Sequence, residues 1–258
     1  MIPIGDSIQS RSTPYVNVSI IAACVLVFLY QLTLTSVTVP QLGIFSELDR
    51  FFRDWGAVPA CLTDSAGLSP NASPRLIEAL CPDDARLAMT PLTAMFLHGG
   101  WLHLGGNMIF LWVFGDNVED AMGHARYAIF YLLTGLLATA AHIALNQSDL
   151  TPVIGASGAI AGVLGAYLML FPRANVTAIL PIFILFWIPF HVPAVFLIGF
   201  WFLLQIFSGV ASITSTDVAG GTAWFAHIGG FVAGVLLVRL FALRRRRRRR
   251  LRVIPGGR

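Results

Sequence analysis

Residues 155–171 read GASGAIAGVLGAYLMLF, a stretch without a charged side chain. A membrane-spanning helix needs about 20 apolar residues to cross roughly 30 Å of hydrocarbon. The 15 residues from Ser157 to Phe171 would reach only roughly 22 Å as a helix. We therefore expect this helix to begin below the membrane surface. Irregular backbone at that depth is tolerated only beside protein or water, so the pattern predicts a water-accessible cavity at Ser157.

The rest of the chain has the same apolar character. Hydrophobic residues make up 56% of the 258 residues and charged residues 12%, about half of the ~25% that is usual in soluble domains. The 17 basic residues are all Arg, and eight of them lie between Arg244 and Arg252. This composition excludes a soluble enzyme, a disordered protein and a disulfide scaffold, and it indicates a polytopic membrane protein.

The apolar stretches predict an all-α bundle of six membrane-spanning helices. We place these helices at residues 18–37, 95–115, 126–146, 156–171, 193–209 and 223–243. The stretch 175–191 is also apolar, but it contains Pro181 and Pro189. Because each Pro removes a backbone donor, we interpret this stretch as a re-entrant or interfacial segment and not as a seventh span.

The positions of the Arg residues predict that both termini are cytoplasmic, because Arg is enriched in cytoplasmic connections. The Arg-rich tail, residues 244–258, follows the last span, and the short stretch 1–17 precedes the first. The membrane domain covers 18–243 and includes one long polar segment, 38–94, which this topology places outside. That segment contains Cys61 and Cys81, either as a disulfide or as two free thiols.

Polar side chains inside membrane helices are costly, and they mark functional sites or interhelical hydrogen bonds. His103 and Asn107 are four residues apart, so they share one face of the second predicted helix. His98 lies near the start of that helix, where we interpret it as a structural residue bonded to loop backbone. His142 and Gln205 are isolated in their helices, and we interpret both as interhelical hydrogen-bonding groups.

Two glycine pairs with the spacing G-x-x-x-G follow Ser157 and His227 in the fourth and sixth predicted helices. Their members are Gly158, Gly162, Gly230 and Gly234. Because such pairs let two helix backbones approach closely, packing along them would bring Ser157 and His227 together at similar depth. A Ser beside a His is the minimal pair of nucleophile and general base. Candidate donors for an oxyanion are His103, Asn107 and the Ser157 backbone N–H.

These residues resemble the rhomboid family of intramembrane serine proteases. The matching motifs, in the family's order, are His103-x-x-x-Asn107, Gly155-Ala156-Ser157-Gly158 and Ala226-His227-x-x-Gly230-x-x-x-Gly234. The resemblance implies a six-helix membrane fold and hydrolysis by a Ser–His dyad, without a metal or other cofactor. It makes Ser157 the nucleophile and His227 the general base, with His103 and Asn107 helping to hold the oxyanion.

The resemblance also implies the partners and the supporting residues. The substrates would be single-span transmembrane proteins, cut near the outer end of their helix in what we expect to be a prokaryotic cell membrane. Structural helpers would be His98 and the motif glycines, which include Gly155. Three positions depart from the family's pattern. Met89 and Thr90 stand where many members have Trp-Arg, and Ala161 stands where some have an aromatic ring that stacks on the catalytic His. The sequence therefore does not indicate what orients His227.

Other functions remain open at this point. A transporter or channel could use His103, Asn107 and His227 along a pathway, and an inactive relative could bind membrane clients without cutting them. A metalloprotease is not favoured, because the sequence has no H-E-x-x-H motif. The Arg-rich tail indicates contact with membrane lipids. No aromatic residues are interleaved in it, so we expect no nucleic-acid partner.

Overall fold

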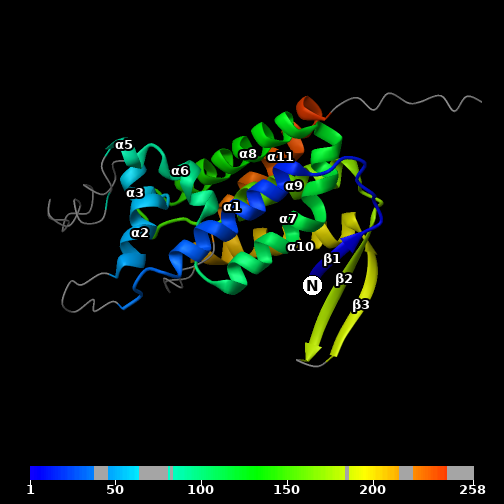
Figure 1. Ribbon diagram of the computed structural model, residues 1–258, viewed down its shortest axis with the longest axis horizontal. Helices are drawn as coiled ribbons and strands as arrows, with labels where there is room; N and C mark the ends of the chain where they lie inside the picture. The colour runs from blue at the N-terminus through cyan, green and yellow to red at the C-terminus, as the bar shows by residue number, and fades with distance from the viewer. Residues whose placement is uncertain (38–45, 64–80, 82–83, 184–185, 215–222, 243–258) are drawn as a thin grey trace, which may run out of the picture.

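The computed structural model describes residues 1–37, 46–63, 81, 84–183, 186–214 and 223–242. Within these ranges the chain is mostly helical, and one small antiparallel sheet lies at one end of the helical bundle (Figure 1). The Arg-rich tail predicted from the sequence lies outside the described residues.

Long helices form the body of the described molecule, and each overlaps one of the stretches that the sequence predicts as a span. They are α1 (Tyr15–Gln31), α7 (Trp101–Met122), α8 (His124–Leu145), α9 (Ser157–Leu170), α10 (Ala194–Thr214) and α11 (Trp224–Phe241). The largest difference concerns α7, which begins six residues later than predicted, after a short 3₁₀ helix, η3 (Ala94–Phe96). It also continues past residue 115 through a polar last turn, which the apolar pattern could not predict.

Length and composition make three of the described helical segments capable of crossing a membrane: His124–Leu145, Ala194–Ser212 and Trp224–Phe241. Helices α1 and α9 are shorter apolar helices. Helix α9 has 14 residues, which corresponds to roughly 21 Å at 1.5 Å per residue. The short helix predicted after residue 155 is therefore present, and its first residue is Ser157.

Helix α9 is the most enclosed helix of the bundle, since every residue from Gly158 to Tyr167 is buried. Its closest neighbour is α11. A methyl group added at Gly230 would lie 2.0 Å from the carbonyl oxygen of Gly158, and one added at Gly234 would lie 2.0 Å from that of Gly162. Only glycine permits backbones to approach so closely. Because both contacts advance in the same direction along the chain, α9 and α11 run parallel and begin at the same end.

The described residues between α1 and α7 include the short α-helices α2 (Glu47–Trp55), α3 (Pro59–Leu62), α5 (Asp84–Leu87) and α6 (Thr90–Thr93). Figure 1 shows α2, α3 and α5 together at the end of the bundle opposite the sheet. A disulfide joins Cys61 and Cys81, which decides between the two alternatives that the sequence left open. The segment also supports the connection before α9, because Ala57 and Val153 exchange backbone hydrogen bonds.

The sheet corrects the prediction of an all-α fold. Strand β1 (Ile2–Asp6) pairs with β2 (Asn175–Phe183), which pairs with β3 (Phe186–Pro193), both antiparallel. The described residues of the apolar stretch 175–191 thus form the two strands of a β-hairpin that projects from the bundle (Figure 1), and they include no helix of a seventh span. Its many β-branched residues favour strands. Pro189 lies on the edge strand β3 and Pro181 at a register shift of β2, positions at which a sheet tolerates proline.

Buried acidic groups anchor the N-terminal region at the sheet end of the bundle. The fully buried Glu119 accepts hydrogen bonds from the backbone N–H groups of Val16 and Asn17, at 3.0 and 2.7 Å. A carboxylate suits this position, because the first N–H groups of α1 have no partner within the helix. Asp6 accepts hydrogen bonds from Tyr167 and Asn117. Burial raises the pKa of Asp6, although these hydrogen bonds oppose that shift.

Candidate active site

Ser157 is held at the start of α9 by a tight turn. Gly155 has φ of +121°, a conformation that favours glycine, and its N–H donates to the carbonyl of Ala94 at 2.8 Å. The helix begins at Ser157, two residues after this glycine. The geometry explains why a glycine stands two residues before this serine.

His227 reaches Ser157 from the neighbouring helix. It is the fourth residue of α11, and its Nε2 lies 2.7 Å from Ser157 Oγ. Both side chains are half-buried. The distance is within the range for an O–H···N hydrogen bond between a nucleophile and a base. The parallel packing of α9 and α11 therefore brings together the two residues that the sequence singled out.

The other ring nitrogen of His227 contacts a residue whose role the sequence did not reveal. Nδ1 lies 2.8 Å from Gln205 Oε1, on α10. Two tryptophans also lie beside the ring, with centroid distances of 6.0 Å for Trp201 and 6.2 Å for Trp224. The sequence feature that singles out Gln205 is its amide side chain, which lies in a helix that is otherwise almost wholly apolar. We predicted an interhelical hydrogen bond for Gln205, but the sequence gave no indication that its partner would be His227.

His103 and Asn107 face the turn at Gly155 from α7. Gly99 N–H donates to His103 Nδ1 at 3.3 Å, so in a neutral ring the proton resides on Nε2. A methyl group added at Gly155 would lie 2.7 Å from this Nε2 and 3.7 Å from Asn107 Nδ2. Asn107 is 8% exposed, and its Nδ2 has no hydrogen-bond partner among the described residues. Two donors thus lie close to the backbone at Gly155, two residues before Ser157.

His98 is held apart from the Ser–His contact. It is fully buried, and its backbone N–H and carbonyl are bonded to the side chain of Gln31 at 3.1 and 2.8 Å. Its ring packs edge-on against that of His103, with centroids 5.2 Å apart. Two of the departures from the family pattern lie nearby in the chain: Met89 is exposed, and the buried Thr90 begins α6.

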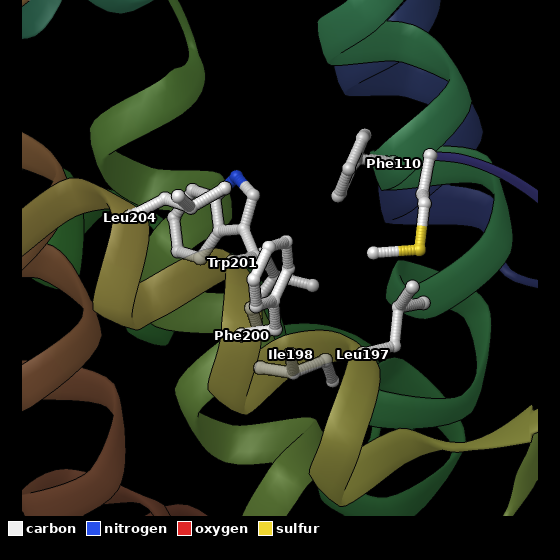
Figure 2. Close-up of a pocket in the computed structure, with 8 residues that line it drawn as sticks. Phe110, Leu197, Ile198, Phe200, Trp201 and Leu204 are labelled. Carbon is white, nitrogen blue, oxygen red and sulfur yellow. The ribbon is translucent and has the colours of Figure 1, made fainter. Parts of the chain in front are cut away.

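An apolar cavity of about 70 Å³ lies between α7 and α10 (Figure 2). Phe110 lines it from α7, while Leu197 and Trp201 are among the residues that line it from α10. Since Trp201 also contacts the ring of His227, this cavity adjoins the candidate site. Within the part of the chain that the structure describes, no group of three His, Cys, Asp or Glu side chains is arranged to hold a metal ion.

Comparison with known proteins places these features in a family. The Rhomboid domain family matches residues 87–244, more than half of the chain. RHOMBOID-like protein 6, mitochondrial, of Arabidopsis thaliana is 29% identical over 146 residues, which are 57% of this chain and 41% of the relative. Rhomboid protein 1, mitochondrial, of Saccharomyces cerevisiae is 32% identical over 147 residues, 55% of this chain and 38% of the relative.

A bacterial relative matches over a shorter region. Rhomboid protease GluP of Bacillus subtilis is 40% identical over 77 residues, which cover 30% of this chain and 15% of the relative. The matched regions therefore span less than half the length of each of these three relatives. The family match nevertheless covers α7 to α11, the helices that carry the candidate site. The chain belongs to the rhomboid family of polytopic membrane proteins.

Proposed function

We propose that this protein is an intramembrane serine protease that cuts single-span transmembrane substrates near the outer end of their helix. The observation that carries the proposal is the 2.7 Å contact between Ser157 Oγ and His227 Nε2. A serine hydroxyl is a weak nucleophile unless a base accepts its proton. The proposal also draws on family membership, since the Bacillus subtilis relative is named a rhomboid protease.

The chemistry follows from the positions of the donors and acceptors. Ser157 Oγ attacks the carbonyl carbon of the scissile peptide bond, while His227 Nε2 takes the hydroxyl proton. The carbonyl oxygen becomes an oxyanion, which accepts hydrogen bonds from His103 Nε2–H, Asn107 Nδ2–H and the Ser157 backbone N–H. When the C–N bond breaks, His227 returns the proton to the leaving amine. Water then cleaves the acyl-enzyme ester, with His227 as general base, and restores the Ser157 hydroxyl.

The motif glycines have structural roles in this proposal. Gly155, which has no side chain, lets His103 and Asn107 lie close to the backbone before Ser157, so that both could reach a substrate carbonyl oxygen bound beside Ser157. Contacts between the α9 and α11 glycines set the depth at which Ser157 meets His227. A larger residue at Gly230 would separate the two helices, because its Cβ would lie 2.0 Å from the Gly158 carbonyl oxygen. A larger residue at Gly158 would instead collide with Ala138 of α8, at 2.7 Å.

We also propose six membrane spans with both termini in the cytoplasm, so that the site lies near the outer face. The Arg distribution supports this topology. So does the Cys61–Cys81 disulfide, since disulfides persist in oxidising compartments outside the cytoplasm. Reporter fusions after Arg126, Arg173 and Arg252 should read cytoplasmic, while those near Gln147 and within 215–222 should read external. An external reading after Arg252 would contradict the topology.

The decisive experiment tests cleavage and labelling in the same preparation. The purified protein, reconstituted in lipid vesicles with a single-span test substrate, should cut the substrate, and a fluorophosphonate probe should label Ser157. Ser157→Ala should lose both. A matched control is Ser19→Ala, because Ser19 is an exposed serine of α1 that bonds only its own helix backbone, and this variant should keep both. Cleavage that survives Ser157→Ala would refute the dyad.

Two further outcomes would identify the other functions. Failure of the wild-type protein to cut or to be labelled, with the substrate still bound, would indicate an inactive client-binding relative. Transport activity that does not require the Ser157 hydroxyl would indicate a transporter.

A helical substrate must also unwind locally before cleavage, because its backbone carbonyls are shielded by hydrogen bonds. Replacing Gly, Pro or Ser near the cut site of the substrate by Leu should therefore slow cutting. Unchanged cutting would show that local unwinding does not limit access.

A further inference from the structure

We propose that Gln205 is a positioning residue that fixes the proton arrangement of His227, an inference that rests on the proposed protease function. His227 is held at both ring nitrogens: Nε2 contacts Ser157 Oγ at 2.7 Å, and Nδ1 contacts Gln205 Oε1 at 2.8 Å. The three residues come from α9, α11 and α10. They form a continuous line of polar groups that crosses three helices.

The hydrogen bonds of Gln205 determine which way its amide points. Its Nε2 donates to the backbone carbonyl of Trp201 at 3.2 Å. A carbonyl oxygen can only accept, so the NH₂ end of the amide must face Trp201 and the oxygen end must face His227. Since Oε1 can only accept, the contact at 2.8 Å requires that His227 Nδ1 carries a proton.

This orientation selects the tautomer that a general base needs. A neutral imidazole has one N–H group, so a proton on Nδ1 leaves a lone pair on Nε2. That lone pair faces Ser157 Oγ, and the hydroxyl can donate to it. When the ring becomes positively charged during attack, its Nδ1–H stays bonded to a neutral oxygen in a low-dielectric setting. Gln205 thus performs the orienting role that a carboxylate has in a Ser–His–Asp triad, but without a charge.

The neighbours of His227 offer no equivalent acceptor among the described residues that contact its ring. Trp201 and Trp224 lie at centroid distances of 6.0 and 6.2 Å, and an indole N–H can only donate. Ala161, one turn after Ser157, is fully buried and has neither a ring nor a polar group. Gln205 itself is only 6% exposed. Burying an amide inside an apolar helix is costly unless its hydrogen bonds are made, and Gln205 makes one at each end.

The test compares Gln205→Leu with Gln205→Glu in reconstituted protein. Leu removes the acceptor and keeps similar bulk, so kcat should fall roughly 10- to 100-fold, as for outer partners of functional histidines, with KM unchanged. Glu restores an acceptor and should recover most of this loss. Because a carboxylate beside Nδ1 stabilises the charged ring, the acidic limb of kcat/KM should move to higher pH in Gln205→Glu.

The rate at which a fluorophosphonate labels Ser157 gives a second measurement that does not depend on substrate binding. Labelling should slow in Gln205→Leu and should follow the shifted pH profile in Gln205→Glu. A matched control is Gln31→Leu, because Gln31 is also a buried glutamine but bonds only the backbone of His98. This variant should keep the wild-type pH profile, even where its melting temperature falls.

The outcomes separate the inference from the proposed function. If Ser157→Ala still cuts, the protease assignment fails. If Ser157 is required while Gln205→Leu keeps the wild-type kcat and pH profile, the inference about Gln205 alone fails. The inference also fails if Gln205→Leu and Gln205→Glu lose activity equally, with the same fall in melting temperature and no shift of the pH profile.

Discussion

Two histidines in this molecule each have a glutamine partner, and the two pairs are built differently. Gln31 bonds the backbone N–H and carbonyl of His98, and the ring Nε2 of His98 has no hydrogen-bond partner among the described residues. Gln205 bonds the ring of His227, whose other nitrogen contacts Ser157. The first pair fixes the path of the chain, while the second fixes the position of a proton.

This difference separates a structural histidine from a chemically competent one. A ring that contributes only volume and packing can do without a partner for one of its nitrogens. A ring that must accept a proton at Nε2 needs its Nδ1–H bonded, because otherwise the tautomer and the ring rotation are free to vary. The pairing at the second nitrogen is therefore a better indicator of function than burial, which His98 has to a greater degree.

The largest effect expected from this comparison is in a pair of alanine variants. His227→Ala should abolish cleavage, with a loss of roughly 10⁶ in kcat, as when the base of a serine protease is removed. His98→Ala should retain the chemistry but should lower stability, by roughly 1–3 kcal/mol for a buried side chain. Cleavage rates and melting temperatures of both variants, measured in the same detergent, test the contrast.

The double variant Ser157→Ala/His227→Ala serves as the control for the pairing. Residues that act as a unit are not additive, so the double variant should be no worse than either single variant. Clearly additive losses would mean that Ser157 and His227 act separately. They would therefore contradict the proposal that the two residues act as one catalytic pair.

An intermediate effect is expected at Asn107. Like His98, it has a buried nitrogen without a partner among the described residues, but its Nδ2 lies beside Gly155, close to Ser157 in the chain. Asn107→Ala should therefore lower kcat by roughly 10²–10³, the usual loss of one oxyanion donor, because other donors remain. A loss as complete as that of Ser157→Ala would assign Asn107 a structural role.

Much of the packing around the candidate site could be predicted, because it depends on the spacing of residues within single helices. The G-x-x-x-G pairs predicted which two helices meet, since close backbone approach requires glycine at those positions. The hairpin at 175–191 could not be predicted so well. Apolar composition indicates burial or membrane contact, but it does not distinguish a strand from a short helix, and the pairing of β2 with the N-terminal β1 joins segments far apart in the sequence.

The partner of His227 could not be predicted for a similar reason. Gln205 lies 22 residues away on a different helix, and no spacing rule relates a residue of one helix to the face of another. His142 shows that the sequence pattern alone is ambiguous. It too was interpreted as an interhelical hydrogen-bonding group, yet its Nδ1 has no partner among the described residues. Isolated polar residues in apolar helices therefore identify candidates, and the packing of the helices decides which of them has a partner.

The smallest effect on catalysis is expected at Gln31. This variant is the strictest test of the comparison between the Gln31–His98 and Gln205–His227 pairs. Gln31→Leu leaves the buried N–H and carbonyl of His98 without their partners, and each unmade bond of this kind costs about 1–3 kcal/mol. The melting temperature should therefore fall. Below the unfolding transition, kcat should stay within about twofold of wild type. We set this bound well under the 10–100-fold loss that is usual for an outer partner of a functional histidine. Thermal unfolding and the pH profile of cleavage, measured on the same sample, separate the two effects. A shifted pH profile in this variant would mean that Gln31, through His98 and the adjoining ring of His103, also influences the reacting groups. The distinction between a glutamine that holds backbone and one that holds a proton would then not stand.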